Sequence, residues 1–255
     1  MRTFFSFRNH EFFLISILGV NFIDCCYNLA IKKLKSGCLM VVPSGPGLAT
    51  IGKDLRYTEA VQNADFAIPD SGYMVLLLRL LKGIKINKFS GYYFFKNFFK
   101  ENFNKNDLFL IDPNKEESKI NNAYLNKIGI PIKKSFQYVA PIYGNGKIED
   151  KFLINRLNTL TTKPKYIMIN LGSGVQEPLG HYLKQNLNFN PGIICTGAAI
   201  AFFTGRQANI SPFIDKLSLG WLWRCIRNPK VFIPRYLSAF SLLFLILKAD
   251  VKVIK

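Results

Sequence analysis

Several short apolar runs in this sequence end in turns rich in Gly and Ser, residue types that let a backbone approach a phosphate or a sugar. Ser44-Gly45-Pro46-Gly47 follows one run, Leu171-Gly172-Ser173-Gly174 another, and Gly197 a third. Glycine permits close approach of the backbone, and the N–H groups of a following helix bind negative charge. One such turn is a weak signal, but three of them predict a nucleotide or sugar-phosphate site. None matches GxGxxG or GxxxxGK[ST], so dinucleotides and ATP are not indicated.

The elements that must position these turns are short buried strands alternating with helices. Five apolar runs have the character of such strands, at residues 38–42, 65–68, 107–111, 166–170 and 193–196. Continuous apolar strands that alternate with helices predict an α/β fold, a mostly parallel sheet with helices on both faces. Ligands of such sheets bind beyond the carboxyl ends of the strands, where the three turns and Pro69-Asp70-Ser71-Gly72 fall.

The charge of the chain is strongly basic. The 34 Lys and Arg residues against 16 Asp and Glu give a formal net charge of +18 at pH 7. Such a protein attracts polyanions, namely phosphorylated ligands, nucleic acid or anionic lipid, although a genome biased toward Lys is an alternative for part of the excess. The five cysteines form no CxxC pair and the two histidines are isolated, so neither a disulfide framework nor a zinc site is indicated. A reducing cytoplasm is therefore expected.

Residues 216–248 are basic, aromatic and apolar, and contain both tryptophans but no acidic residue. This composition is typical of an interfacial membrane segment, with rings at the headgroup level and cations on lipid phosphates. One alternative is a helical pair that packs on the sheet with a solvated basic face. Another is a groove for single-stranded nucleic acid, which no RNP, KH or zinc-finger motif supports. No run reaches the roughly 20 apolar residues of a spanning helix, and residues 236–247 suit a core or interfacial helix.

A second basic and aromatic stretch covers residues 85–103. Its phenylalanines Phe94, Phe95, Phe98 and Phe99 fall at helical spacing. This spacing favours packing in the core, whereas exposure of the stripe would suggest a groove for an acceptor lipid.

Motifs along most of the chain resemble those of the WecG/TagA/CpsF glycosyltransferases. LGV with Asp24 is similar to LGVxxD, VVPSGPGLATIGKD to the segment beginning VTPNPE, and ADFAIPD to ADLVLPDG. LGSGVQE resembles LGxPxQE, CTGAAIAFFTG resembles GVGGAFDFLAG, and LGWLWR, NPK and RY resemble LEWLYR, EPRR and RRY. The order and spacing of these motifs are kept over residues 18–247, which is more specific than any one motif, although residues 114–164 match poorly.

The resemblance implies a Rossmann-like catalytic domain at residues 1–205 and a basic, aromatic C-terminal appendage at residues 206–255 that closes over the site and touches the membrane. It implies inverting transfer of an N-acetylhexosamine-type sugar from a UDP-sugar to a polyprenyl-diphosphate-linked saccharide, without a metal ion or other cofactor. The expected partners are both substrates and an anionic membrane surface but no nucleic acid, and a homo-oligomer is left open. The expected location is peripheral, at the cytoplasmic face of the bacterial inner membrane.

The resemblance also assigns roles to residues. Asp70 matches the proposed catalytic Asp, which would deprotonate the acceptor hydroxyl, and its alternative role is the N-cap of the following helix. Gln176 matches a polar residue of the sugar site, and its alternative is an exposed glutamine in a first helical turn. Arg224, Lys230 and Arg235 would hold the diphosphate, or provide only membrane-surface charge. The remaining predicted substrate-binding residues belong to the turns and are Ser44, Gly45, Ser71, Gly172, Ser173 and Gly197.

Several positions depart from the family pattern. Val42 and Ser44 replace Thr and Asn, Tyr93 and Ala201 replace Asp, Ser71 replaces Gly and Gly220 replaces Glu. Because several of these positions are expected to line the donor site, the donor sugar and the acceptor stay open, with capsule, lipopolysaccharide or exopolysaccharide assembly as candidate settings. A catalytically weakened relative that acts as a membrane-associated scaffold or binds lipid-linked sugar is the alternative function.

Overall fold

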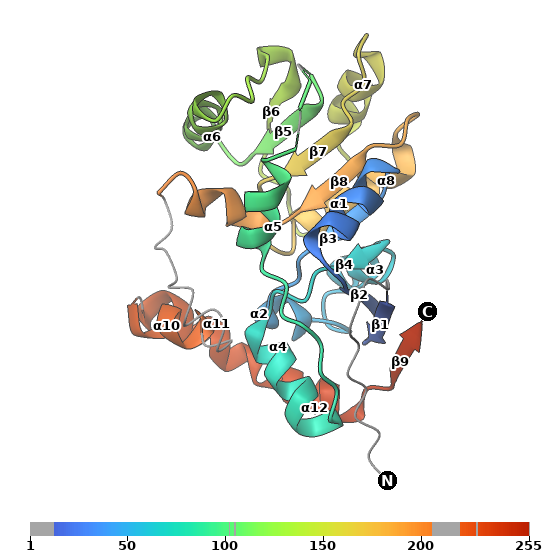
Figure 1. Ribbon diagram of the computed structural model, residues 1–255, viewed down its shortest axis with the longest axis vertical. Coiled ribbons are helices and arrows are strands. Elements are labelled where there is room, and N and C mark those ends of the chain that lie inside the picture. Colours follow the sequence, from blue (N-terminus) through green and yellow to red (C-terminus); the bar gives the residue numbers. More distant parts are fainter. Residues whose placement is uncertain (1–12, 102, 105, 206–219, 228, 255) are drawn as a thin grey trace.

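The computed structural model describes residues 13–101, 103, 104, 106–205, 220–227 and 229–254. Within these residues one sheet of nine strands, in the order β6-β5-β7-β8-β3-β4-β2-β1-β9, forms the centre of the molecule (Figure 1). The strands are β1 Phe13–Ile17, β2 Val20–Asp24, β3 Leu39–Val41, β4 Phe66–Ala67, β5 Leu108–Asp112, β6 Gln137–Val139, β7 Tyr166–Ile169, β8 Gly192–Cys195 and β9 Val251–Ile254.

The strands from β6 to β2 pair in parallel, whereas β1 pairs antiparallel with both β2 and β9. The five strands predicted from apolar runs appear as β3, β4, β5, β7 and β8, each within two residues of the predicted ends. The predicted fold class, an α/β fold with a mostly parallel sheet, is therefore confirmed.

Helices cover both faces of the sheet (Figure 1). They are α1 Tyr27–Lys35, α2 Gly45–Leu48, α3 Leu55–Gln62, α4 Gly72–Leu77, α5 Gly91–Phe98, α6 Lys115–Lys127, α7 Lys151–Thr159, α8 Gln176–Asn186, α10 Gly220–Arg227, α11 Pro229–Ala239 and α12 Ser241–Lys248. A π-helix, η1 Leu78–Lys82, continues α4, and two 3-10 helices are η2 Lys134–Phe136 and η3 Gly197–Phe202. Side-chain oxygens of Ser44, Asp54 and Ser71 cap α2, α3 and α4, which fixes where these helices begin after their turns.

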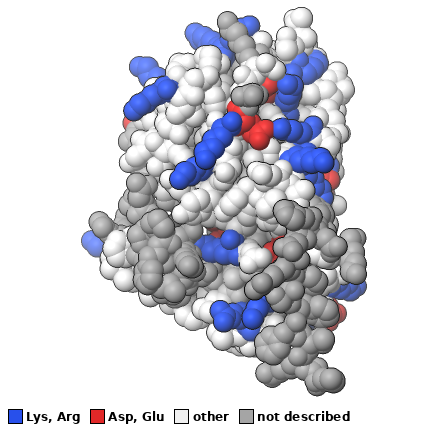
Figure 2. Space-filling model, viewed as in Figure 1, with Lys and Arg blue, Asp and Glu red and all other residues white. Residues whose placement is uncertain are grey.

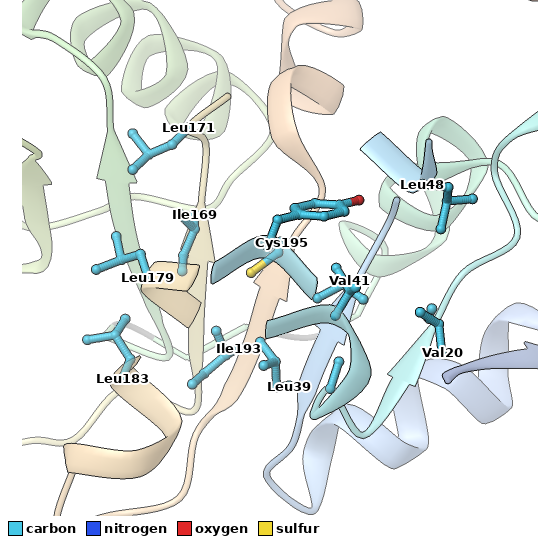
Figure 3. Packing of buried hydrophobic residues seen from close by; sticks show 14 of the residues in the cluster. Val20, Leu39, Val41, Leu48, Ile169, Leu171, Leu179, Leu183, Ile193 and Cys195 are labelled. Atoms are coloured by element: carbon cyan, nitrogen blue, oxygen red, sulfur yellow. The ribbon is translucent and has the colours of Figure 1, made fainter. Parts of the chain in front are cut away.

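Two apolar cores lie on opposite faces of the sheet because successive strand residues point to opposite sides. Val41 and Cys195 belong to the first core, together with residues of α2, α3, α4, α7, α8 and α12. Figure 3 shows this core, where Leu179 and Leu183 of α8 lie against the strands. Met40 belongs to the second core, with residues of α1, α5, α6 and η3. Phe94, Phe95 and Phe98 are buried there and Phe99 packs against them partly buried, which confirms the predicted core packing of this phenylalanine stripe.

Four strands were not predicted from the sequence: β6 at one edge of the sheet, and β2, β1 and β9 at the other. Leu18 and Gly19 both have positive φ, 56° and 77°, the conformation that a two-residue hairpin turn between β1 and β2 requires. β9 comes from the segment assigned to the appendage, yet it pairs with β1, and Leu242 and Ile246 of α12 are buried in the first core. The division at residues 205 and 206 stays a prediction.

Residues 236–247 were expected to form one core or interfacial helix. The structure divides them between α11 and α12, with Phe240 at the junction. The helix α12 is packed on one side, through Leu242 and Ile246, and exposed on the other, through Phe244 and Leu247. Among the described residues, no helix is both long and apolar enough to cross a membrane.

Close packing of α8 on the sheet predicts that Gly180→Ala will destabilise the protein. A methyl group there would lie 2.6 Å from Cys195 Sγ and 2.9 Å from Leu39 Cδ1. Overpacking costs about 1–3 kcal/mol, and alanine gains at most roughly 1 kcal/mol over glycine in a helix. We expect the free energy of unfolding in urea to fall by up to about 2 kcal/mol. The control is Gly144→Ala, where no atom lies within 4 Å and little change is expected.

Candidate active site

The site is built at one edge of the sheet, where the neighbouring strands β7, β8, β3 and β4 end. Their parallel pairing brings together four turns, which contain Ser44 and Gly45, Asp70 and Ser71, Gly172 and Ser173, and Gly197. A methyl group on Gly45 would lie 3.0 Å from Ser71 Oγ, and one on Gly47 would lie 3.2 Å from Ser173 Oγ. The turn after β3 therefore touches the turns after β4 and β7, as the sequence predicts.

Asp70 is partly exposed at this edge, and one of its two oxygens is fixed. Its Oδ1 accepts a hydrogen bond from the N–H of Gly91, the first residue of α5, over 3.0 Å. Within the described part of the chain, Oδ2 has no hydrogen-bond partner. The alternative role of Asp70 as N-cap of the following helix is wrong, because Ser71 Oγ accepts the N–H of Met74 and caps α4. One carboxylate oxygen thus fixes Asp70 against the start of α5, and the side chain stays partly exposed.

Gln176, at the start of α8, connects the turns after β7 and β8. Its side chain is 2% exposed, so the alternative of an exposed first-turn glutamine is wrong. Gln176 Oε1 accepts a hydrogen bond from the N–H of Gly197 over 2.6 Å, and its Nε2 donates to Glu177 Oε1 over 3.0 Å. The amide therefore ties the start of α8 to the turn after β8. A direct contact between Gln176 and a sugar stays a prediction.

Glu177 is a fully buried carboxylate that sequence reasoning passed over, although it stands in the LGSGVQE motif. Its Oε2 accepts the N–H of Gly174 over 2.8 Å, and Oε1 accepts the hydroxyl of Ser173 over 3.3 Å. Burial raises the pKa of Glu177 above its usual value, and the donors around it oppose that shift. This carboxylate fixes the shape of the turn after β7.

Three glycine N–H groups at the site already have partners inside the protein. Gly47 N–H bonds Ser44 Oγ, Gly174 N–H bonds Glu177 and Gly197 N–H bonds Gln176. In this arrangement these three amides are therefore occupied and are not available to a bound phosphate. The predicted binding roles of Gly172, Ser173 and Gly197 stay predictions.

Three of the departures from the family pattern lie in or beside α5, the helix that binds Asp70. A methyl group on Gly91 would lie 3.7 Å from Val42 Cγ1 and 3.9 Å from Ala199 Cβ. Tyr93 stands in the first turn of α5, and Ala201 belongs to η3, which packs against α5. Val42, an apolar residue in place of the family's Thr, therefore adjoins Gly91, whose N–H holds Asp70.

The predicted diphosphate-binding residues lie on α10 and α11. Lys230 is exposed, and the side chains of Arg224 and Arg235 lie outside the described residues. Helix α10 contacts α4 and α11 contacts α2, so both helices lie beside elements that begin at the site. Within the described part of the chain no group of three or more His, Cys, Asp and Glu side chains could hold a metal ion, and metal independence stays a prediction.

The Gln176 contacts predict that Gln176→Leu will destabilise the protein. Leucine has a similar size but leaves the Gly197 N–H without its acceptor, at a cost of about 1–3 kcal/mol. Urea unfolding measures this loss. Gln185→Leu on the same helix is the control, since Gln185 is exposed and its loss should change stability by no more than about 0.5 kcal/mol. Equal effects of the two substitutions would contradict a specific role of Gln176.

Burial of Glu177 predicts a pH dependence. Because its pKa is raised in the folded protein, folding takes up a proton, and this group lowers stability as pH rises from about 4.5 through the folded pKa. Glu177→Gln cannot ionise and lacks this loss. The free energy of unfolding of the wild type minus that of the variant should therefore fall as pH rises. A value of this difference that increases with pH would contradict the raised pKa.

Comparison with known proteins identifies the family of the chain. The family model described as "Glycosyl transferase WecG/TagA/CpsF family" matches residues 15–254. A similar protein from Bacillus subtilis (strain 168) is N-acetylglucosaminyldiphosphoundecaprenol N-acetyl-beta-D-mannosaminyltransferase, with 25% identity over 196 residues, covering 72% of this chain and 71% of that protein. The matched region includes all four turns of the site and α10–α12. The chain therefore belongs to the WecG/TagA/CpsF family of glycosyltransferases.

Proposed function

We propose that this glycosyltransferase moves a sugar of the N-acetylhexosamine type from a UDP-sugar to a polyprenyl-diphosphate-linked saccharide, with inversion and without a metal ion. The Bacillus subtilis relative, whose name states a lipid-diphosphate acceptor and an N-acetylmannosaminyl donor group, supports this substrate class. The setting would be assembly of a bacterial cell-surface polysaccharide at the cytoplasmic face of the inner membrane.

The observation that carries the proposal is the state of Asp70. A base for sugar transfer needs a carboxylate oxygen that reaches the acceptor and a fixed position from which to do so. Oδ1 is fixed by the Gly91 N–H, and the partly exposed side chain leaves Oδ2 for the acceptor hydroxyl. Asp70 Oδ2 takes the hydroxyl proton as the acceptor oxygen bonds to the anomeric carbon, and the bond from that carbon to the UDP oxygen breaks. Attack opposite the leaving group inverts the anomeric centre.

The departing diphosphate needs positive charge, because UDP leaves with an additional negative charge. The internal partners of Gly47, Gly174 and Gly197 favour side-chain donors over backbone N–H groups for this role. Arg224, Lys230 and Arg235 on α10 and α11 are the residues assigned to it. The same two helices, with α12, would contact an anionic membrane surface, so that substrate and enzyme meet at the lipid.

Substitution of Asp70 separates its two roles. Asp70→Asn keeps an Oδ1 that accepts the Gly91 N–H but cannot accept the acceptor proton, so kcat should fall by about 10²- to 10⁴-fold with little loss of stability. Asp70→Ala removes both roles and should also destabilise the start of α5. The measurement is UDP release in detergent with a panel of UDP-sugars and a short-chain polyprenyl-diphosphate-saccharide acceptor.

The outcomes distinguish the candidate functions. Acceptor-dependent UDP release that is lost in Asp70→Asn supports the transfer reaction and the role of Asp70. Wild-type activity that EDTA does not reduce supports metal independence, and a product of inverted anomeric configuration by NMR supports inversion. UDP binding without turnover on any donor and acceptor favours the scaffold function, for which the departures at Val42, Tyr93, Ala201 and Gly220 are the motivation. Wild-type activity in Asp70→Asn would exclude Asp70 as the base.

A further inference from the structure

The turn after β7 presents the exposed side chain of Ser173 at the edge of the sheet where the site is built. The hydroxyl of Ser173 donates its proton inward, to Glu177 Oε1 over 3.3 Å. A hydroxyl group has one proton and two lone pairs, so a serine that donates inward has only lone pairs left for a ligand. In this arrangement Ser173 can accept a hydrogen bond from a bound molecule but has none to give.

The direction of this hydrogen bond is fixed by the other contacts of Glu177. Gln176 Oε1 accepts the N–H of Gly197, so the other end of the amide must donate, and its Nε2 donates to Glu177 Oε1 over 3.0 Å. The N–H of Gly174 donates to Glu177 Oε2 over 2.8 Å. Donors on both oxygens favour the ionised carboxylate, which has no proton to offer. The hydrogen bond therefore runs from the Ser173 hydroxyl to Glu177.

The hydroxyl of Tyr57, on α3, lies on the buried side of Ser173. A methyl group on Gly47 would lie 2.6 Å from Tyr57 Oη and 3.2 Å from Ser173 Oγ, so both hydroxyl groups approach the same glycine. Tyr57 is 1% exposed, and within the described part of the chain its Oη makes no hydrogen bond of normal geometry, although it faces Ser173. Tyr57 and Glu177 thus close the inner side of Ser173, and only its outer side is open to a ligand.

The charge of this turn is unsuited to a phosphate. Residues 171–177 contain one acidic residue, Glu177, and no basic residue. A phosphate oxygen beside Ser173 would meet the lone pairs of the hydroxyl, with the charge of a buried carboxylate behind them, and both repel it. Lys and Arg side chains predominate over Asp and Glu on the face of the molecule in Figure 2, so cations for a phosphate are plentiful elsewhere. A neutral group that donates a hydrogen bond suits Ser173 better.

The position of Ser173 places such a group within the site. The turn after β3 touches Ser71, the neighbour of Asp70, through Gly45 and touches Ser173 through Gly47. We propose that Ser173 accepts a hydrogen bond from an O–H or N–H group on a sugar ring of the UDP-sugar, so that the turn after β7 recognises a sugar and not the diphosphate. The group belongs either to the transferred sugar or to the ribose. This inference rests on the proposed function, which supplies the UDP-sugar.

Isothermal titration calorimetry with UDP-N-acetylmannosamine, UDP and 2′,3′-dideoxy-UDP tests the inference. All three probes carry the diphosphate, the first two carry ribose hydroxyls, and only the first carries a transferred sugar. Ser173→Ala removes the acceptor, so the Kd of a probe that contains the recognised group should rise about three- to tenfold, as expected for one neutral hydrogen bond. The Kd of 2′,3′-dideoxy-UDP should not change.

The matched control is Ser135→Ala, because Ser135 is an exposed serine of η2 and precedes β6, away from the carboxyl ends of the strands. It should leave all three dissociation constants unchanged, and circular dichroism checks that both variants fold.

The pattern of changes identifies the group that Ser173 binds. A raised Kd for UDP-N-acetylmannosamine alone supports the transferred sugar, and a raised Kd for UDP as well supports the ribose. Equal losses for all three probes would show that Ser173 acts on the diphosphate or on the shape of the turn, and no change for any probe would show that it contacts none. Either result overturns the inference and leaves the proposed function standing. Wild type that binds none of the probes would overturn both.

Discussion

Parallel pairing of β7, β8, β3 and β4 is the constraint on which the site depends. Four neighbouring strands that run in one direction must all end at one edge, and each ends in a turn whose backbone N–H groups need partners. Here side chains in or next to the turns supply these partners. Gln176 accepts the N–H of Gly197, Glu177 accepts the N–H of Gly174, and Asp70 accepts the N–H of Gly91 at the start of α5. The sheet brings the turns together, and these side chains fix their shapes before any substrate binds.

This arrangement divides the work of the site between buried and accessible groups. The side chains of Gln176 and Glu177 are buried and hydrogen-bonded within the protein, and one oxygen of Asp70 is hydrogen-bonded within the protein too. In the proposed mechanism the second oxygen of Asp70 would act as the base, and basic residues of α10 and α11 would meet the charge of the diphosphate. The internally fixed turns and the proposed cationic groups would then come from different parts of the chain.

The central strands could be predicted from local sequence patterns, because a strand buried on both faces is apolar throughout, as in residues 166–169. Such patterns could not predict β9, because Val251–Ile254 is short and partly exposed, and its place depends on pairing with β1 far away in sequence. The partners of Gln176 and Asp70 lie 21 residues away in each case. No local spacing encodes such contacts, so the motif placed both residues at the site while their partners emerged only from the fold.

The position of β9 has a consequence for biosynthesis. Strand β1 is at the edge of the sheet until Val251–Ile254 pairs with it, and those residues leave the ribosome after every other described element. An unpaired edge offers its backbone groups to other chains, and newly made copies are crowded near one another during translation. Lys252 stands in β9, where its charge discourages a further strand from adding to the finished sheet. Completion of the sheet and protection from aggregation therefore arrive together, in a strand of four residues.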